Sequence, residues 1–487
     1  MFGWQVAIWL QESKDQDKAM LTIGKVLRAL GKDTNPRNCQ EVVTGGCIDS
    51  RQATQGSLFV ALAGEQTDGH LYVDQAFEGG AVLALVEHQI DSAYHVFQLD
   101  EIPDCLGKLP FSVIVPNTLA ALQTVAAWWR AQFDIPVIGV TGSVGKSSTK
   151  EAMSALLGYK FRVLKNKGNM NNEIGLPLTL LSLNENHQAA VLEMGFYVPG
   201  EIKLLCKIAK PRIGVVTNIG TVHAERAGNI ETIARGKSEL VQALPAEGLA
   251  VLNNDDLLVR AMADNTSVRI LTYGTNPEAD LWADKIQSKG LEGISFIAHY
   301  AGQSHPITSE LLGKHSVYNL LSSIAVALEL GFSWIDIEEA LRTQEMVQRI
   351  RILTSHTNAL VLDDSYNASP SSTVAALDLL DEMEGEKIAV LGDMLELGQY
   401  ETEGHQQVGR KAAHVAQKIV LVGPLSLLTR DAILDTGFPE DKVRWFTNSE
   451  EAAQFLQENL KAGQVVLVKG SHGMRMDKII AALEEKI

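Results

Sequence analysis

Short runs of apolar residues recur along the chain, separated by longer stretches with helical periodicity. Each run has four to six residues, mostly Val, Ile, Leu and Ala, between Gly, Asn, Asp or Pro. Continuous apolar runs of this length indicate strands that are buried on both faces of a sheet. They predict strands at Pro136–Val140, Ala189–Glu193, Ile213–Thr217, Leu249–Leu252, Ala359–Leu362, Lys387–Leu391, Lys418–Val422 and Gln464–Val468.

The stretches between these runs carry apolar residues at helical spacing. Val317–Leu330 predicts a helix that Gly331 can cap, since glycine readily takes the left-handed conformation at a helix end. Another helix is predicted at Trp334–Leu341. Strands that alternate with helices are typical of an α/β protein with largely parallel sheets. Trp128 and Trp129 lie in a further amphipathic stretch, and we expect both rings to pack in a core or between domains.

The chain of 487 residues is long enough for about three domains. One boundary is predicted near Phe133–Pro136, before a glycine-rich turn. The other is predicted near Thr343–Gln348, where a helix is followed by a new series of strands. The expected domains therefore cover residues 1–134, 135–345 and 346–487, and residues 1–20 have the character of an extension before the first domain.

The composition is that of an acidic globular protein. A net charge of −17 argues against nucleic acid and anionic membrane surfaces as partners, since proteins that bind them are usually basic. The N-terminus has no basic segment or cleavage site of a signal peptide, and no run reaches the roughly 18 apolar residues of a membrane span. The cysteines are few and have no metal-ligand spacing, so we expect a cytoplasmic protein in which Cys39, Cys47, Cys105 and Cys206 are ordinary buried or half-buried residues.

A glycine-rich turn follows the predicted strand Pro136–Val140. The segment Thr141-Gly-Ser-Val-Gly-Lys-Ser147 places two glycines before a lysine and a serine, and a helical stretch begins near Ser148. Such turns let backbone N–H groups approach phosphate oxygens beside a helix N-terminus. We therefore expect a nucleotide triphosphate to bind at Thr141, Gly142, Gly145, Lys146, Ser147 and Ser148. The turn departs from the general G-x-x-x-x-G-K-[ST] pattern, and alone it does not separate kinases, GTPases, motors and ligases.

Further motifs follow in order along the chain. They are Gly168-Asn-Met-Asn-Asn-Glu-Ile-Gly-Leu-Pro177, Glu193-Met-Gly195, Thr217-Asn-Ile-Gly-Thr-Val-His223 and Ala-Arg-Gly-Lys237-Ser-Glu. Together with the T-G-x-x-G-K-S turn they resemble the Mur ligase family over nearly the full chain. The C-terminal part is similar to the branch that adds D-alanyl-D-alanine, through the segments Asp363-Asp-Ser-Tyr-Asn-Ala-Ser-Pro370, Leu391-Gly-Asp-Met-Leu-Glu-Leu-Gly398 and Val468-Lys-Gly-Ser471.

The resemblance implies an ATP-dependent amide-bond ligase that acts in peptidoglycan precursor synthesis. It implies an N-terminal domain for a UDP-sugar substrate, a central P-loop domain for ATP and a C-terminal Rossmann-like domain. The implied substrates are UDP-N-acetylmuramoyl-tripeptide and D-alanyl-D-alanine, and the implied cofactors are ATP and Mg²⁺. A monomer is expected. The alternatives are a related ligase with another amine acceptor and a catalytically silent scaffold that kept the fold.

The resemblance also implies roles for residues of the central domain. The catalytic residues would be Lys146, Glu193, His223 and Lys237, and the Mg²⁺ ligands would be Ser147, Glu193, His223 and Lys237. Lys237 would serve as a carbamate, because a lysine that loses its proton can add CO₂ and become an anionic oxygen ligand. The alternatives are a hydrogen-bonded histidine at a strand end for His223 and a solvated helix lysine for Lys237.

Substrate contacts are implied in the same way. Asn319 resembles the family's adenine contact, Asp364 its ribose contact and Arg349 its γ-phosphate contact, although Arg351 is a competing candidate. Ordinary surface or salt-bridge roles are the alternative for each. The UDP part would meet Ser50 and Arg51, and further substrate contacts are expected from Asn171, Asn172, Asn367 and Ser369.

The sequence departs from the family's pattern at a few motif positions. Val144 replaces an Asn in the glycine-rich turn, and His472 stands where Arg is usual after the Lys-Gly-Ser. The milder departures are Ser147 for Thr, Ser316 for Asn and Gln348 for Gly. None of them removes a residue that the expected chemistry requires.

Overall fold

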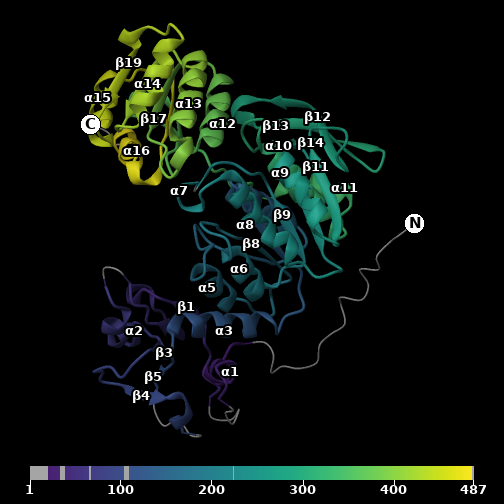
Figure 1. The fold of residues 1–487 in the computed structure, drawn as a ribbon, viewed down its shortest axis with the longest axis vertical. Coiled ribbons are helices and arrows are strands. Elements are labelled where there is room, and N and C mark those ends of the chain that lie inside the picture. Colours follow the sequence, from purple (N-terminus) through teal and green to yellow (C-terminus); the bar gives the residue numbers. More distant parts are fainter. Residues whose placement is uncertain (1–19, 33–38, 65–66, 104–108, 223, 485–487) are drawn as a thin grey trace.

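The computed structural model describes residues 20–32, 39–64, 67–103, 109–222 and 224–484. These residues form three sheets that follow one another along the chain, each with helices packed on it (Figure 1). The predicted α/β class is thus confirmed. Residues 1–19 of the expected extension, Cys105 and His223 lie outside the described residues. In the described part, no helix is long and apolar enough to cross a membrane.

The N-terminal sheet is parallel throughout its described strands. Its strand order is β1-β2-β3-β5-β4, and neighbouring strands run parallel to each other. The strands are β1 Gly45–Cys47, β2 Ser57–Val60, β3 Leu83–Val86, β4 His95–Gln98 and β5 Phe111–Ile114. The helices of this part are α1 Ile23–Ala29, α2 Val73–Glu78 and α3 Thr118–Arg130.

Helix α3 joins the N-terminal sheet to the centre of the molecule (Figure 1). It begins at the cap Asn117, whose side chain accepts a hydrogen bond from Ala120 N. At its other end Trp129 is buried, and its Nε1 donates to Leu183 O at 2.9 Å, while Arg130 Nε donates to Ala209 O at 3.0 Å. Trp129 thus packs in a core, as expected of the pair, and Trp128 is partly buried against the same cluster.

The central sheet combines a parallel body with an antiparallel edge. Among the described residues its order is β14-β13-β12-β11-β10-β9-β6-β8-β7, and only the pairs β12–β13 and β13–β14 are antiparallel. The strands are β6 Val137–Thr141, β7 Val163–Lys165, β8 Ala189–Glu193, β9 Ile213–Val216, β10 Leu249–Asn253, β11 Arg269–Gly274, β12 Leu281–Ser288, β13 Ile294–Tyr300 and β14 Gln303–Ser309.

Both faces of the central sheet are covered by helices. Alternate residues of β6 enter different cores: Val137 packs with the residues of α3, α5, α6 and α8, whereas Ile138 and Val140 pack with those of α4 and α10. This explains why the strand is apolar throughout. The central helices are α4 Lys146–Gly158, α5 Gly175–Leu181, α6 Glu201–Ala209, α7 Ala224–Ala227, α8 Ile230–Gln242, α9 Leu257–Arg260, α10 Ser316–Glu329 and α11 Trp334–Thr343. Helix α4 begins two residues before the predicted start at Ser148.

The C-terminal sheet has the order β15-β16-β20-β17-β18-β19 over the described residues, and only β15 is antiparallel to its neighbour. Its strands are β15 Arg351–Thr354, β16 Leu360–Asp364, β17 Glu386–Gly392, β18 Lys418–Val422, β19 Val443–Phe446 and β20 Gln464–Lys469. Its helices are α12 Pro370–Asp381, α13 Glu401–Val415, α14 Ser426–Asp435, α15 Ser449–Asn459 and α16 Asp477–Glu484.

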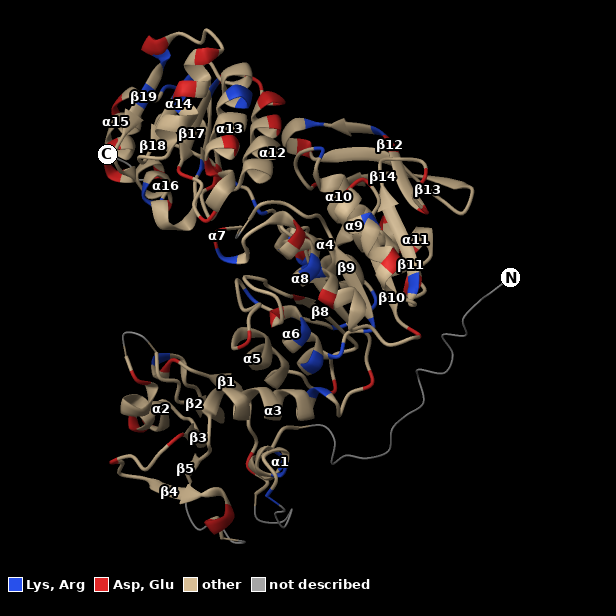
Figure 2. Ribbon diagram, in the orientation of Figure 1, with Lys and Arg blue, Asp and Glu red and all other residues tan. Residues whose placement is uncertain are grey.

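Acidic and basic positions are interspersed over all three parts of the molecule (Figure 2). The net charge of −17 is therefore not confined to one domain. Polar residues instead gather where parallel strands end. Thr141, Glu193 and Thr217 lie at or just after the carboxyl ends of the adjacent strands β6, β8 and β9, and ligands of open α/β sheets bind at such ends.

Candidate active site

The glycine-rich turn connects β6 directly to α4. Its glycines have positive φ angles, +149° at Gly142 and +84° at Gly145, a region that favours glycine. At Gly142 there is also no room for a side chain, because a Cβ would lie 1.9 Å from Thr217 Oγ1. The turn is therefore packed against the end of β9 at a distance that only glycine allows.

The backbone of Val144 is held from the segment that follows β9. Its N–H donates to Asn218 Oδ1 at 2.9 Å. Its carbonyl oxygen accepts from Asn218 Nδ2 at 2.9 Å and from Thr217 Oγ1 at 2.7 Å. Because these bonds involve only main-chain atoms of Val144, the departure from Asn at this position leaves the anchoring of the turn intact.

Two lysines converge on one carbonyl of the turn. Lys146 Nζ donates to Gly142 O at 2.9 Å and to Ser143 O at 3.1 Å, and Lys237 Nζ donates to Gly142 O at 2.9 Å. Burial lowers the pKa of Lys146, the carboxylate of Glu193 raises it part of the way back, and the charge of Arg349 lowers it further. Arg349 belongs to the C-terminal domain, so that domain contributes charge to the turn.

Lys237 lies in α8 and is only 1% exposed, which excludes the solvated helix lysine of the alternative reading. Its Nζ lies 4.7 Å from the centroid of the Phe196 ring. Burial, followed by repulsion from Lys146, lowers the pKa of Lys237 well below its usual value. The lowered pKa favours the neutral amine of Lys237 over its ammonium form.

Glu193 closes the site at the end of β8 and is 2% exposed. Ser147 Oγ donates to its Oε2 at 2.8 Å, and Asn171 Nδ2 donates to its Oε1 at 2.8 Å. Hydroxyl and carboxylate oxygens are the donors that Mg²⁺ prefers, and proteins often hold Mg²⁺ with one or two carboxylates plus substrate phosphates. The pair Ser147 and Glu193 fits this pattern. No group of three or more His, Cys, Asp or Glu side chains with metal-site geometry occurs among the described residues.

The side-chain oxygens of Asn319 and Asn172 accept hydrogen bonds from different parts of the central domain. Asn319, at the start of α10, accepts a hydrogen bond from Thr149 Oγ1 at 3.1 Å, so it stands beside the turn. Asn172 instead accepts from Gly175 N at 2.9 Å and from Ile174 N at 3.3 Å. The oxygen of Asn172 therefore holds the first turn of α5, whereas Asn171 reaches Glu193.

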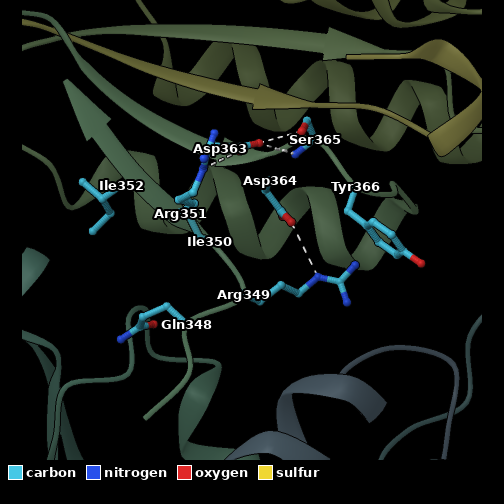
Figure 3. Close-up of a pocket in the computed structure, with 9 residues that line it drawn as sticks. All are labelled: Gln348, Arg349, Ile350, Arg351, Ile352, Asp363, Asp364, Ser365 and Tyr366. Atoms are coloured by element: carbon cyan, nitrogen blue, oxygen red, sulfur yellow. Dashed lines mark hydrogen bonds and ion pairs between the residues drawn. The ribbon is translucent and has the colours of Figure 1, made fainter. Parts of the chain in front are cut away.

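The C-terminal domain presents a cavity of about 550 Å³ (Figure 3). Arg349 and Arg351 are both at this cavity but have different partners. Arg349 Nε lies 3.6 Å from Asp364 Oδ1, and its guanidinium lies 5.6 Å from the centroid of the Tyr366 ring. Arg351 pairs with Asp363 at 3.2 Å and with Glu484 at 3.0 Å. The lining residues are Gln348, Arg349, Ile350, Arg351, Ile352, Asp363, Asp364, Ser365 and Tyr366.

Asp364 is buried at the end of β16 and pairs with a buried lysine. Lys469 Nζ lies 2.5 Å from Asp364 Oδ2 and also donates to Asn367 O at 2.9 Å. Burial lowers the pKa of Lys469, while Asp364 raises it and Arg349 lowers it. The other oxygen, Oδ1, is buried and accepts no hydrogen bond from a described residue, and Arg349 Nε lies 3.6 Å from it.

The remaining expected substrate residues make contacts within their own domains. Ser50 Oγ donates to Gln75 Oε1 at 2.7 Å. Arg51, whose side chain is 80% exposed, pairs with Asp49 at 2.8 Å. Asn367 Oδ1 accepts from the N–H of its neighbour Ala368, and Ser369 caps α12. The structure brings none of these side chains into contact with the glycine-rich turn.

The departures at Gln348, Ser316 and His472 each have a structural partner. Gln348 spans the two domains: its Nε2 donates to Glu310 O at 2.5 Å, and its Oε1 accepts from Leu312 N at 3.3 Å. Ser316 Oγ donates to Leu312 O at 2.6 Å. The ring of His472 lies 5.7 Å from that of Tyr366.

Several residues of the site had no role assigned from the sequence. These are Lys150, Asn166, Asn218 and Lys469, all of which contact a residue of the turn, Glu193 or Asp364. Asn218 and Lys469 lie inside motifs and could have been found there. Lys150 gave no signal, because a lysine on a helix is usually exposed.

The fold and the site define the class: a three-domain α/β protein with a glycine-rich turn between β6 and α4 of the central domain and an Arg349–Asp364 pair in the C-terminal domain. Three family descriptions match the chain: "Mur ligase family, catalytic domain" at residues 42–127, "Mur ligase middle domain" at 140–327 and "Mur ligase, glutamate ligase domain" at 348–472. The chain belongs to the Mur ligase family, and it is an enzyme of the ligase class.

Similar proteins and structures cover almost the whole chain. The UDP-N-acetylmuramoyl-tripeptide–D-alanyl-D-alanine ligase of Bacillus subtilis is 34% identical over 93% of this chain and 96% of its own. The ligase of the same name from Escherichia coli K12 is 33% identical over 90% and 93%. Among solved structures, MurF from Acinetobacter baumannii superposes with a TM-score of 0.82 at 29% identity, covering 96% of this chain and 99% of that one. MurF from Thermotoga maritima in complex with ADP gives a TM-score of 0.75 at 27% identity, covering 91% and 98%.

Substitution of Gly142 tests the packing of the turn. In Gly142→Ala the new Cβ would overlap Thr217 Oγ1, and the positive φ would be strained, so the turn must shift. Overpacking of this kind costs roughly 1–3 kcal/mol. If this cost is taken from the free energy of ADP binding, the affinity for ADP should weaken about tenfold or more. Calorimetric titration with ADP measures this. Gly220→Ala is the matched control, because its Cβ would meet Ser143 Cβ at an ordinary 3.6 Å. Equal affinities for the two variants would contradict the prediction.

Proposed function

We propose that this ligase uses ATP to join D-alanyl-D-alanine to UDP-N-acetylmuramoyl-tripeptide, forming an amide bond in peptidoglycan precursor synthesis. The observation that carries the proposal is the arrangement of the half-buried Ser147 and the buried Glu193 and Lys237 around the turn, with the charge of Arg349 reaching it from another domain. Support also comes from relatives named UDP-N-acetylmuramoyl-tripeptide–D-alanyl-D-alanine ligase, which match nine-tenths or more of the chain, and from the ADP complex of the Thermotoga maritima structure.

The nucleotide would lie between the central and C-terminal domains. The N–H groups of the turn and of the first turn of α4 would receive the β- and γ-phosphates, together with Lys146. Arg349 would meet the γ-phosphate, since its charge lowers the pKa of Lys146 in the turn. Arg351 is instead paired with Asp363 and Glu484. Asp364 Oδ1 would accept a hydrogen bond from the ribose, and Asn319 would lie at the base.

The reaction would proceed in two steps. A carboxylate oxygen of the tripeptide attacks the γ-phosphorus of ATP, the bond to the bridging β–γ oxygen breaks, and ADP leaves from the acyl phosphate. The amine of the dipeptide then attacks the acyl carbon, the carbon–oxygen bond breaks, and phosphate leaves as the nitrogen loses its proton. Nucleophile and electrophile are both anionic in the first step, so positioning and neutralisation of charge by Lys146 and Arg349 would carry most of the catalysis.

Mg²⁺ would be held by Ser147 and Glu193, whose oxygens are hard donors. When bound it would neutralise phosphate charge. Lys237 would add an anionic ligand as a carbamate: its neutral amine attacks CO₂, forms a carbon–nitrogen bond and loses a proton. Burial and low pKa favour the neutral amine that this addition needs. His223, proposed as a further ligand, lies outside the described residues.

The other substrate contacts follow the domain arrangement. Ser50 and Arg51 would bind the UDP part in the N-terminal domain, and Asn171, Asn172 and Asn367 would contact the peptide or its carboxylates. We propose domain boundaries at residues 134 and 345, between α3 and β6 and between α11 and β15. We further propose that the enzyme acts as a monomer in the cytoplasm on these small, charged substrates.

Phosphate release tests the reaction. The purified protein with ATP and Mg²⁺ should release phosphate when UDP-N-acetylmuramoyl-tripeptide and D-alanyl-D-alanine are both present, because the acyl phosphate must form and then be consumed. Either substrate alone should give little turnover. Release that requires a different amine would move the activity to a related ligase, and the absence of release with any combination would favour a silent scaffold.

Substitution of each arginine of the cavity tests which of them contacts the γ-phosphate. Arg349→Ala should lower kcat by about 100-fold or more, the usual effect of removing a group that stabilises transition-state charge. Arg351→Ala should stay within about threefold of the wild type, since it removes an exposed ion pair. Steady-state kinetics of both variants under saturating substrates provide the measurement. A larger loss in Arg351→Ala would assign the phosphate contact to Arg351.

The carbamate is tested by carbon-13 NMR. Protein equilibrated with ¹³C-bicarbonate should give a carbamate carbonyl resonance, because burial lowers the pKa of Lys237 and favours the neutral amine that adds CO₂. Lys237→Met should lack this resonance and should lose turnover. The same spectrum in both proteins would refute a carbamate at this position.

A further inference from the structure

Lys150 is a buried cation to which the proposed reaction gives no part. It lies in α4, one turn after Lys146, and is 1% exposed. An ammonium group removed from water is costly unless it is paired and hydrogen-bonded. Lys150 Nζ donates to Asn166 O at 2.8 Å and lies 3.1 Å from Glu151 Oε1 and 4.0 Å from Glu193 Oε2. It therefore stands between two carboxylates and beside the segment that carries Asn171.

Asn166 connects Lys150 to the main chain at the end of β8. This asparagine is fully buried. Its Oδ1 accepts from Glu193 N at 2.9 Å, and its Nδ2 donates to Glu193 O at 2.9 Å and to Met170 O at 2.8 Å. A shift of Asn166 would thus move the backbone of Glu193 and the segment up to Asn171 together. Lys150 Nζ donates its hydrogen bond to the main-chain carbonyl oxygen of Asn166.

The two carboxylate oxygens of Glu193 have different hydrogen-bond donors. Oε1 accepts a hydrogen bond from Asn171 and Oε2 accepts one from Ser147. Lys150 Nζ lies 4.0 Å from Oε2, which is beyond hydrogen-bond distance. Lys150 can therefore orient the carboxylate by charge and through Asn166 without occupying a ligating lone pair. Hydrogen-bonded and charged neighbours of this kind fix the direction in which a metal ligand points.

Glu151 supplies the balancing anion. Burial by itself raises the pKa of this carboxyl group, but the hydrogen bond from Lys165 and the charge of Lys150 bring it below its usual range. Glu151 is thus anionic and is shared by one buried and one more exposed lysine. Removal of Lys150 would leave the carboxylates of Glu151 and Glu193 without the cation that separates them.

We propose that Lys150 is a positioning residue that sets the orientation in which Glu193 meets the Mg²⁺ of a bound nucleotide. The inference rests on the proposed function, because it takes Glu193 as a metal ligand. It differs from a purely structural role in one respect: loss of Lys150 should weaken the contribution of Mg²⁺ to nucleotide binding and leave Mg²⁺-free binding unchanged.

The test compares ADP affinity with Mg²⁺ and with EDTA for the full-length wild type and for Lys150→Met. Methionine keeps an unbranched side chain at this buried position and removes the charge. The gain in ADP affinity due to Mg²⁺ should fall about 10- to 100-fold, the usual range for a group that orients a metal ligand. ADP affinity in EDTA should stay near that of the wild type, since it depends on the backbone of the turn.

Lys165→Met is the matched control. Lys165 pairs with the same Glu151 but from a position at which its side chain is 38% exposed. The variant should keep the wild-type effect of Mg²⁺. Lys150→Gln keeps a donor for Asn166 O without the charge, and serves if the Met variant fails to fold. An intermediate effect of Mg²⁺ in this variant would support the proposal.

Two results would overturn the proposal. One is an equal loss of ADP affinity with Mg²⁺ and with EDTA, and the other is an unchanged effect of Mg²⁺ in both Lys150 variants. If Mg²⁺ does not change the ADP affinity of the wild type, the metal site of the proposed function is refuted. The proposed role of Lys150 is then refuted as well.

Discussion

The structure of this site depends on the burial of one carboxylate. Glu193 is 2% exposed at the end of β8, and an ionised carboxylate in such a place must be given partners. They come from three segments: Ser147 from the start of α4, Asn171 from the loop before α5, and Asn166 at the backbone. Lys150 adds a cation from the next turn of α4. The close packing of β6, β8 and the glycine-rich turn follows from the need to assemble these partners.

A second consequence is a local excess of cations in an acidic protein. The net charge of the chain is −17, yet Lys146, Lys237, Arg349 and Lys469 lie around the turn and the facing cavity. Burial lowers the pKa of all three of these lysines, and their neighbours modify the shift. Anionic substrates would relieve this repulsion. The overall charge comes from acidic and basic positions that are spread along the whole ribbon in Figure 2, whereas the short distances inside the site decide which ligand it attracts.

The site is completed only where two domains meet. Asp364 and Arg349 belong to the C-terminal domain, and the turn belongs to the central one. Gln348 bonds across this junction to Glu310 and Leu312, and Glu225 N donates to Glu396 O at 3.2 Å. The position of the C-terminal sheet is thus tied to the central domain at the linker and again at α7. Small changes at these contacts would change how Arg349 and Asp364 face the turn.

The sequence by itself determined the buried parallel strands and the glycine-rich turn. Strands β8 and β18 have the predicted bounds, because continuous apolar runs mark strands buried on both faces, and the turn is marked by glycines that local backbone geometry requires. The antiparallel strands β12 to β14 were missed, although the alternating burial of β13 reflects a period-two pattern. Only the tertiary structure decided that Lys150 and Lys469 are buried, that Asn171 rather than Asn172 reaches Glu193, and that Arg349 and Arg351 have different partners. Burial and pairing of a charge depend on segments far apart in the chain, and the identity of a residue does not carry that information.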